Sequence, residues 1–254
     1  MTSLQASGLA TEWLTIETPD GPMRAYQVTP HRDNAPEQRA AVIVLQEAFG
    51  VNEHIQDVTR RFASQGYLAV APDLFHRSGV KAVDYADRDQ AMALIGGLGP
   101  DPIITDVAAV VTHLSEAEEI SSSRTALVGF CFGGRAAFTA ATALDVGATV
   151  VFYGPGIANG PHAVLDRAGS IKSPVLMFVG DSDPTITAEH VAAIQSASTS
   201  MSSELRVETF TGAGHAFFCD ARPQAYVAEA AQRAWSDTTE FLARGLSRSG
   251  HESH

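Results

Sequence analysis

A cysteine between two glycines stands where a predicted strand meets a predicted helix. Residues 129–133 read Gly-Phe-Cys-Phe-Gly, after the apolar run 125–130 and before a helical pattern over 135–144. The glycines give the backbone room for a sharp strand-to-helix turn, which leaves the apex side chain exposed in a strained conformation. A thiol at the N-terminus of a helix ionises more readily. The motif predicts that Cys131 is a nucleophile; a small buried cysteine and a phosphate-binding turn are the alternatives.

Two later strand ends carry an acid and a base. Asp181 and Asp183 follow one apolar run, and His215 follows the next, at 205–210, in a glycine-rich loop. Carboxyl ends of parallel strands meet at one edge of a sheet, so these side chains are expected near Cys131. Neutral imidazole can accept the thiol proton, and a carboxylate can fix its tautomer. We expect a triad with Asp183 as its acid and Asp181 as the alternative, in the nucleophile–acid–base order of α/β-hydrolases.

The elements that must position these residues alternate between strand and helix patterns. Strands are expected at 12–18, 23–29, 40–45, 67–71, 125–130, 148–153, 174–179 and 205–210. Helices are expected at 53–65, 83–94, 103–118, 135–144 and 223–242. Buried strands separated by helices predict a mostly parallel sheet with helices on its faces. We expect an α/β-hydrolase fold in one domain over residues 1–246, without a large lid, with a polar loop at 31–39 and a disordered tail at 247–254.

Composition narrows the classes of partner. The chain has 254 residues, 45% of them apolar, and a formal net charge of −12. The apolar content is enough for a full core, and the negative charge argues against nucleic acid or an anionic membrane as a partner. Two cysteines, no signal-peptide pattern and no apolar run of about 20 residues favour a cytoplasmic protein.

A set of short motifs resembles the dienelactone hydrolase family over about residues 23–242. The motifs are Gln46-Glu47 with Gly50 and Asn52, Gln65-Gly66-Tyr67, Pro72-Asp73-Leu74, the cysteine turn and Gly214-His215-Ala216-Phe217. The resemblance implies that Cys131 is the nucleophile of a triad with Asp183 and His215. It also implies an oxyanion hole made by the backbone N–H groups of Phe132 and Ala48.

The resemblance further implies that Glu47 holds the resting thiol and that arginines bind a carboxylate of the substrate. Arg88 matches one of these arginines. The position of the second holds Cys219, and Arg222, three residues further along, is the candidate to replace it.

The expected function is hydrolysis of a small lactone or carboxylic ester through an acyl-enzyme, with no cofactor and no metal. The partner is then a small-molecule substrate, and the sequence does not indicate an oligomeric state. A general carboxylesterase or thioesterase on the same triad is the alternative. A non-catalytic binding protein is more remote, because no triad member is missing. A metal site would need clustered ligands, and His215 and Cys219 have no second pair beside them.

Overall fold

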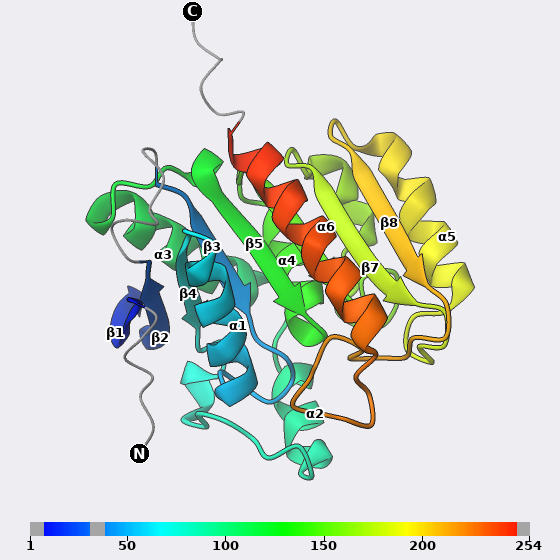
Figure 1. The fold of residues 1–254 in the computed structure, drawn as a ribbon, viewed down its shortest axis with the longest axis horizontal. Coiled ribbons are helices and arrows are strands. Elements are labelled where there is room, and N and C mark those ends of the chain that lie inside the picture. Colours follow the sequence, from blue (N-terminus) through cyan, green and yellow to red (C-terminus); the bar gives the residue numbers. More distant parts are fainter. Residues whose placement is uncertain (1–7, 31–38, 248–254) are drawn as a thin grey trace, which may run out of the picture.

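Eight strands form a single twisted sheet, in the order β1-β2-β4-β3-β5-β6-β7-β8 (Figure 1). The computed structural model describes residues 8–30 and 39–247. The strands are β1 (Ala10–Thr18), β2 (Gly21–Thr29), β3 (Ala41–Leu45), β4 (Leu68–Pro72), β5 (Thr125–Phe130), β6 (Ala148–Phe152), β7 (Val175–Gly180) and β8 (Leu205–Phe210). Every neighbouring pair from β4 to β8 is parallel, whereas β2 pairs antiparallel with both β1 and β4. The predicted α/β fold is confirmed.

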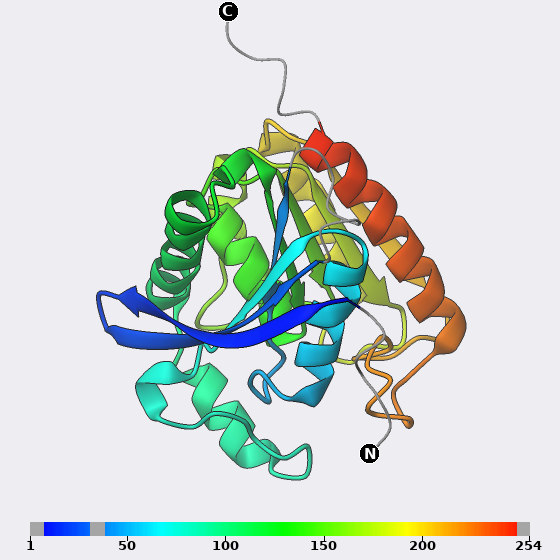
Figure 2. The same ribbon diagram turned by 60° about the vertical axis from the view of Figure 1, so that its left-hand side comes forward.

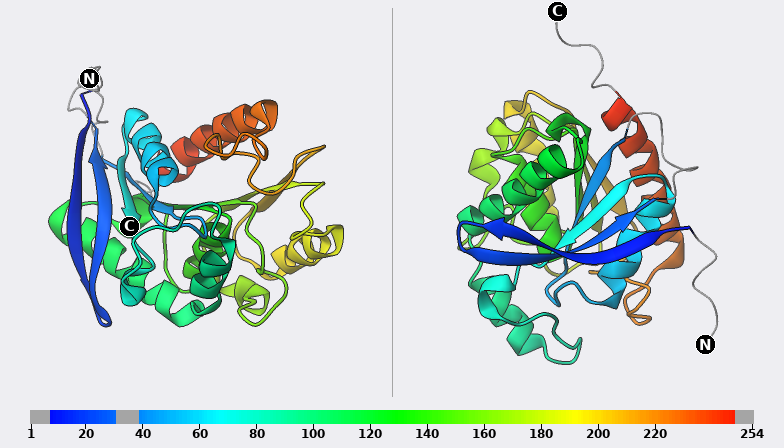
Figure 3. Two further views of the ribbon diagram at one scale, coloured as in Figure 1. Left: turned by 90° about the horizontal axis from the view of Figure 1, so that it is seen from below. Right: turned by 90° about the vertical axis from the view of Figure 1, so that its left-hand side faces the viewer.

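Helices cover both faces of the sheet, which is why its central strands are apolar along their whole length. They are α1 (Glu53–Ser64), α2 (Arg88–Gly96), α3 (Pro100–Ala117), α4 (Phe132–Ala141), α5 (Ala188–Ala197) and α6 (Ala228–Ser247). Viewed along the sheet, α1 and α6 lie on one side, and α3, α4 and α5 lie on the other (Figure 3). Strands β3 to β7 are buried at every residue. Such two-sided burial is typical of parallel sheets.

Several predicted helix boundaries were wrong. Residues 83–87 are not helical, because α2 begins only after Asp87, whose side chain accepts a hydrogen bond from the Gln90 N–H. The helix predicted from residue 135 starts at Phe132, directly after the turn. The last helix begins at Ala228, after a run of turns, and continues to Ser247. Ser247 therefore belongs to α6, while residues 31–38 of the expected loop and 248–254 of the expected tail lie outside the described residues.

The sheet edge opposite β8 is a long antiparallel hairpin of β1 and β2, which crosses the molecule in Figure 2. In the described ranges no single helix is long and apolar enough to span a membrane. Helices α2 and α3 reach that length and composition only as a pair, and the pair is bent by 87°. The apolar face of α3, which includes Ile103, Val107 and Val110, is buried.

Candidate active site

The turn between β5 and α4 holds Cys131 in an unusual conformation. Its φ is 55° and its ψ −119°, outside the regions that L-residues favour. A Cβ on Gly129 would lie 1.8 Å from the Gly133 carbonyl oxygen, and a Cβ on Gly133 would lie 2.1 Å from the Leu45 carbonyl oxygen. Neither position accepts a side chain. The two glycines therefore let the turn pack against β3 and place Cys131 at the carboxyl end of the sheet.

The structure brings Cys131, His215 and Asp183 together. His215 Nε2 lies 3.0 Å from Cys131 Sγ, and His215 Nδ1 lies 2.7 Å from Asp183 Oδ2. The other carboxylate oxygen of Asp183 accepts hydrogen bonds from the Thr185 hydroxyl and backbone N–H. All four residues come from loops or turns at the carboxyl ends of β5, β7 and β8, which lie at the lower end of Figure 1.

The environment favours a charged imidazole. Burial of the ring works against the charge, but the Cys131 sulfur and then the Asp183 carboxylate raise the pKa of His215 to about 10. Asp183 is itself buried, which opposes its charge, yet its bonds to His215 and Thr185 lower its pKa. His215, supported by Asp183, can therefore hold a proton taken from the Cys131 thiol.

Asp181 has a different set of partners. Its carboxylate accepts hydrogen bonds from the Gly212 N–H and the Ser182 hydroxyl, at 2.8 and 3.0 Å. It thus ties the end of β7 to the loop after β8. Asp183 is the acid in contact with His215.

The two predicted oxyanion donors come from the turns after β5 and β3. The Phe132 N–H begins α4, and Ala48 is buried in the turn after β3. Neither N–H donates to a backbone acceptor in the described turns and loops. Ala48 and Phe49 pack in a small apolar cluster with Val83 and Ala91, so the segment that leads into α2 supports this turn.

Glu47 lies buried in a second polar cluster. It is 1% exposed, and neither of its carboxylate oxygens has a hydrogen-bond partner in the structure described. Potential ligand atoms of Glu47, His54 and Cys219 all lie within 4.8 Å of one another. This acid, imidazole and thiol could hold a soft divalent cation such as Zn²⁺. This cluster shares Cys219 with the pair His215 and Cys219, which the sequence analysis considered as metal ligands, but it does not include His215.

Two tyrosines that the sequence reading did not single out complete this cluster. The Tyr85 hydroxyl lies 3.6 Å from Cys219 Sγ and accepts a hydrogen bond from the Asn52 side chain. Tyr153, at the end of β6, is fully buried with an unpaired hydroxyl, and its ring contacts His215. Burial, and then the Glu47 carboxylate, raise the pKa of both tyrosines. In the sequence, the position of Tyr153 at the end of a predicted strand is a signal that could have pointed to the site.

Backbone strain gathers at the same place. Four described non-glycine residues have a positive φ, and three of them are Cys131, Tyr153 and Ala216. Cys131 is the predicted nucleophile. The Tyr153 ring contacts His215, and Ala216 follows His215 in the chain. Such conformations persist where the surrounding structure enforces them, and they concentrate at functional sites.

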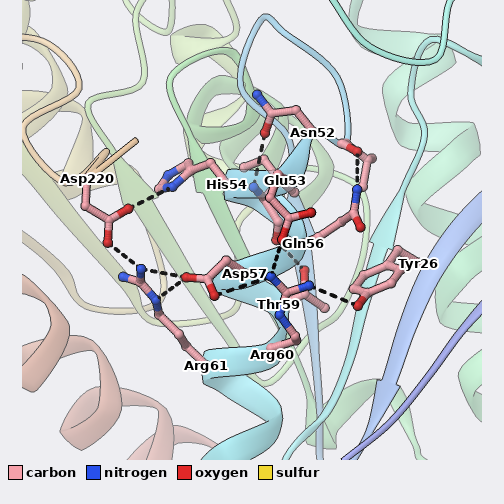
Figure 4. Close-up of polar contacts among 12 residues, drawn as sticks. Tyr26, Asn52, Glu53, His54, Gln56, Asp57, Thr59, Arg60, Arg61 and Asp220 are labelled. Atoms are coloured by element: carbon pink, nitrogen blue, oxygen red, sulfur yellow. Dashed lines mark hydrogen bonds and ion pairs between the residues drawn. The ribbon is translucent and has the colours of Figure 1, made fainter. Parts of the chain in front are cut away.

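Polar contacts along α1 fix the loop that follows His215. Figure 4 shows Asp220 between His54 and Arg61, and Arg61 also contacts Asp57. His54 Nδ1 lies 3.2 Å from Asp220 Oδ1. Burial opposes the charge of Asp220, but Arg61 lowers its pKa. These contacts therefore attach the loop that carries His215 and Arg222 to α1, whose apolar side is buried in the core.

The two predicted substrate arginines lie apart from the triad contacts. Arg88 is exposed in the first turn of α2 and makes none of the hydrogen bonds or ion pairs found among the described residues. The Arg222 guanidinium lies over the rings of Phe49 and Tyr85, 5.8 and 5.5 Å from their centroids. It faces the Glu47 cluster, where its charge acts against the raised pKa values of Cys219 and Tyr153.

A cavity of about 400 Å³ lies against residues that neighbour the triad. Phe132, which follows Cys131, and Thr185, whose hydroxyl is 3.2 Å from His215 Nδ1, are part of its wall. The rest comes from α2 and from the loop after β6. Its volume suits a small organic molecule.

The sequence model of the dienelactone hydrolase family matches residues 23–246, most of the chain. The chain belongs to this family of carboxylic ester hydrolases. A Yersinia pestis protein named "Putative carboxymethylenebutenolidase" is 34% identical over 251 residues, covering 96% of this chain and 92% of that protein. A Bradyrhizobium protein named "Probable 2-oxo-3-(5-oxofuran-2-ylidene)propanoate lactonase" is 29% identical, covering 92% and 94%.

The fold agrees with solved members of the family. The crystal structure of a "Putative Dienelactone Hydrolase" from Klebsiella pneumoniae superposes with a TM-score of 0.83 at 27% identity, covering 93% of this chain and 99% of that one. The similarity therefore extends over most of the chain.

Proposed function

We propose that this dienelactone hydrolase family member cleaves a small lactone or carboxylic ester through an acyl-enzyme on Cys131. The observation that carries the proposal is the continuous chain of contacts from Cys131 Sγ through the His215 ring to Asp183, at 3.0 and 2.7 Å. A thiol, an imidazole and a buried acid in this order form the arrangement needed for nucleophilic acyl transfer.

The first half-reaction forms a thioester. His215 accepts the Cys131 proton at Nε2, and the thiolate attacks the carbonyl carbon of the substrate. The N–H groups of Phe132 and Ala48 donate to the oxyanion of the tetrahedral intermediate. When the carbon–oxygen bond breaks, His215 returns the proton to the leaving oxygen. In a lactone this oxygen stays attached to the acyl group.

The second half-reaction releases the product. His215 removes a proton from water, the resulting hydroxide attacks the thioester, and the thiolate leaves and is reprotonated. Asp183 accepts the Nδ1–H bond throughout and stabilises the imidazolium. The sum is ester plus water giving acid plus alcohol, with the enzyme regenerated.

Glu47 has a proposed role before substrate binds. With Cys131 turned to His215, both Glu47 oxygens lack a partner. A carboxylate next to the turn that supplies Ala48 is suited to accept the thiol hydrogen bond in a second rotamer of Cys131. A thiol held in this way resists oxidation better than an exposed thiolate. Both cysteines are free, which supports the cytoplasm as the proposed location.

A panel of small lactones, aryl esters and acyl thioesters tests the proposed reaction. We expect turnover of lactones and aryl esters that disappears in Cys131→Ala. The lactonase name of the Bradyrhizobium relative supports lactones ahead of thioesters. Turnover of thioesters alone would make the protein a thioesterase on the same residues. Activity that survives Cys131→Ala would contradict the proposal.

A further inference from the structure

The cluster of Glu47, His54 and Cys219 joins three segments that are distant along the chain. Glu47 lies in the turn after β3, His54 in the first turn of α1, and Cys219 in the loop after β8. Each residue is at most 4% exposed, and potential ligand atoms of the three lie within 4.8 Å of one another. A carboxylate, an imidazole and a thiol are therefore gathered in one place away from water.

Two members of the cluster lack the partners that buried polar groups need. Neither carboxylate oxygen of Glu47 has a hydrogen-bond partner within the described residues, and His54 Nε2 has none either. Removing a carboxylate from water is costly unless an opposite charge or hydrogen bonds replace the solvent. A cation between these two side chains would supply the missing partner to both.

The contacts around the cluster are those expected around a metal site. His54 Nδ1 lies 3.2 Å from a carboxylate oxygen of Asp220 (Figure 4), which leaves Nε2 as the nitrogen available to a metal. A carboxylate behind a histidine ligand commonly fixes the orientation and tautomer of its ring. The Tyr85 hydroxyl accepts a hydrogen bond from Asn52 and lies 3.6 Å from Cys219 Sγ, so it can donate its own proton to the sulfur.

The three types of donor atom favour Zn²⁺ over harder cations. Thiolate and imidazole are common ligands of Zn²⁺, whereas Mg²⁺ and Ca²⁺ prefer oxygen ligands. A tetrahedral Zn²⁺ holds its ligand atoms roughly 3.3–3.7 Å apart, so the three atoms need to approach one another by no more than about 1.5 Å. The charges of one carboxylate and one thiolate also balance the charge of the ion.

We propose that Glu47, His54 and Cys219 bind one Zn²⁺ ion, with water as the fourth ligand. On binding, the Cys219 thiol releases its proton to the solvent and its sulfur coordinates the ion. This inference goes beyond the proposed esterase function and does not depend on it. A carboxylate has two oxygens, so Glu47 can bind the ion through one and accept the Cys131 hydrogen bond through the other.

Metal titration of the full chain tests the site. Protein treated with a chelator and then dialysed against Zn²⁺ should retain one ion per chain, measured by elemental analysis. Titration with Co²⁺ in place of Zn²⁺ should give the near-ultraviolet charge-transfer band of a thiolate–cobalt bond and the visible bands of a tetrahedral ion. Zn²⁺ should also raise the thermal midpoint of unfolding, because the ion joins three segments of the folded chain.

Matched variants assign the ligands. Cys219→Ala and Glu47→Gln should each weaken Zn²⁺ binding about tenfold or more, and Cys219→Ala should remove the charge-transfer band. Asp220→Asn should weaken binding about 10- to 100-fold through the orientation of His54. Cys131→Ala is the control: it removes the other cysteine and should keep the stoichiometry, the band and the thermal shift. Circular dichroism checks the folding of each variant, and Glu47→Gln, which keeps the shape of its side chain, decides if Cys219→Ala does not fold.

Three results would overturn the inference. The wild type could retain no Zn²⁺ after dialysis. The wild type and all the variants could bind Zn²⁺ equally, which would mean adventitious binding elsewhere on the chain. The charge-transfer band could disappear in Cys131→Ala and persist in Cys219→Ala, which would place the ion on the predicted nucleophile. These measurements concern metal binding alone, so the proposed ester hydrolysis would stand in each case.

Discussion

At the scale of single residues, each proposed role follows from what a side chain contacts. The Cys131 thiol is partly exposed beside His215, whereas Cys219 is fully buried and its thiol lies 3.6 Å from the Tyr85 hydroxyl. Burial, and then the Glu47 carboxylate, raise the pKa of Cys219 to about 12. We therefore expect Cys131 to react and Cys219 to stay inert, because a buried thiol with a raised pKa is neither ionised nor accessible.

Alkylation tests this difference. Brief treatment with iodoacetamide near pH 7 should label Cys131 and leave Cys219 unmodified, with activity lost in proportion to labelling. Peptide mass spectrometry identifies the modified residue, and the Cys219→Ala variant serves as a control that should still be inactivated. Labelling of Cys219 alone, with full activity retained, would show that Cys131 is not the reactive thiol.

The two neighbouring acids should differ sharply on substitution. Asp183→Asn removes the carboxylate that faces His215 Nδ1, so kcat/KM should fall about a hundredfold or more. Asp181→Asn alters only contacts to Ser182 and Gly212 and should cost less than about tenfold. Steady-state kinetics on one aryl ester measures both. Equal losses would mean that neither acid orients the imidazole.

At the scale of elements, the site depends on how closely β3, β5 and α4 approach one another. The carbonyl oxygens of Leu45 and Gln46 occupy the space that a Cβ on Gly133 would need, at 2.1 and 2.6 Å. These atoms are backbone in a buried strand, so they cannot move aside cheaply. The glycines of the turn thus serve the packing of three elements as well as the exposure of the thiol.

Gly133→Ala should therefore be strongly destabilising. We expect a loss of about 2–4 kcal/mol in the free energy of unfolding, as for other overpacked core positions. Gly96→Ala is the matched control, because nothing lies within 4 Å of its Cβ and it stands in the last turn of α2. It should be neutral or slightly stabilising. Denaturant unfolding compares the two, and equal stabilities would contradict the packing argument.

At the scale of the whole molecule, the sequence was enough to predict the fold, but it was not enough to predict much of the cavity. All eight strands were expected near their observed positions, since buried β-branched runs leave a strong local signal. Helix boundaries were less accurate where caps decide them, as at Asp87. Arg135, which is part of the cavity wall, has the appearance of an ordinary helix residue in the sequence. Its burial depends on the loop after β6, which is distant in the chain and contributes Pro155 and Gly156 to the same cavity.

The charge state of the site should affect the stability of the molecule. The pKa of His215 is raised in the folded state, so its contribution is fully present below about pH 6.5, the unfolded value, and is lost as the pH rises toward 10. Removing the sulfur in Cys131→Ala removes the leading cause of the rise. The free energy of unfolding of the wild type relative to this variant should therefore decline between about pH 6.5 and 10. A constant difference over this range would contradict the ion-pair description.

Trapping of the acyl-enzyme tests the central claim most directly. A 4-nitrophenyl ester mixed with the enzyme and quenched in acid within the first turnover should leave a mass increase equal to the acyl group. Tandem mass spectrometry should place it on the peptide that contains Cys131, and the adduct should be absent from Cys131→Ala. An acyl group on another residue, or turnover with no adduct under conditions that accumulate acyl-enzymes, would contradict the account.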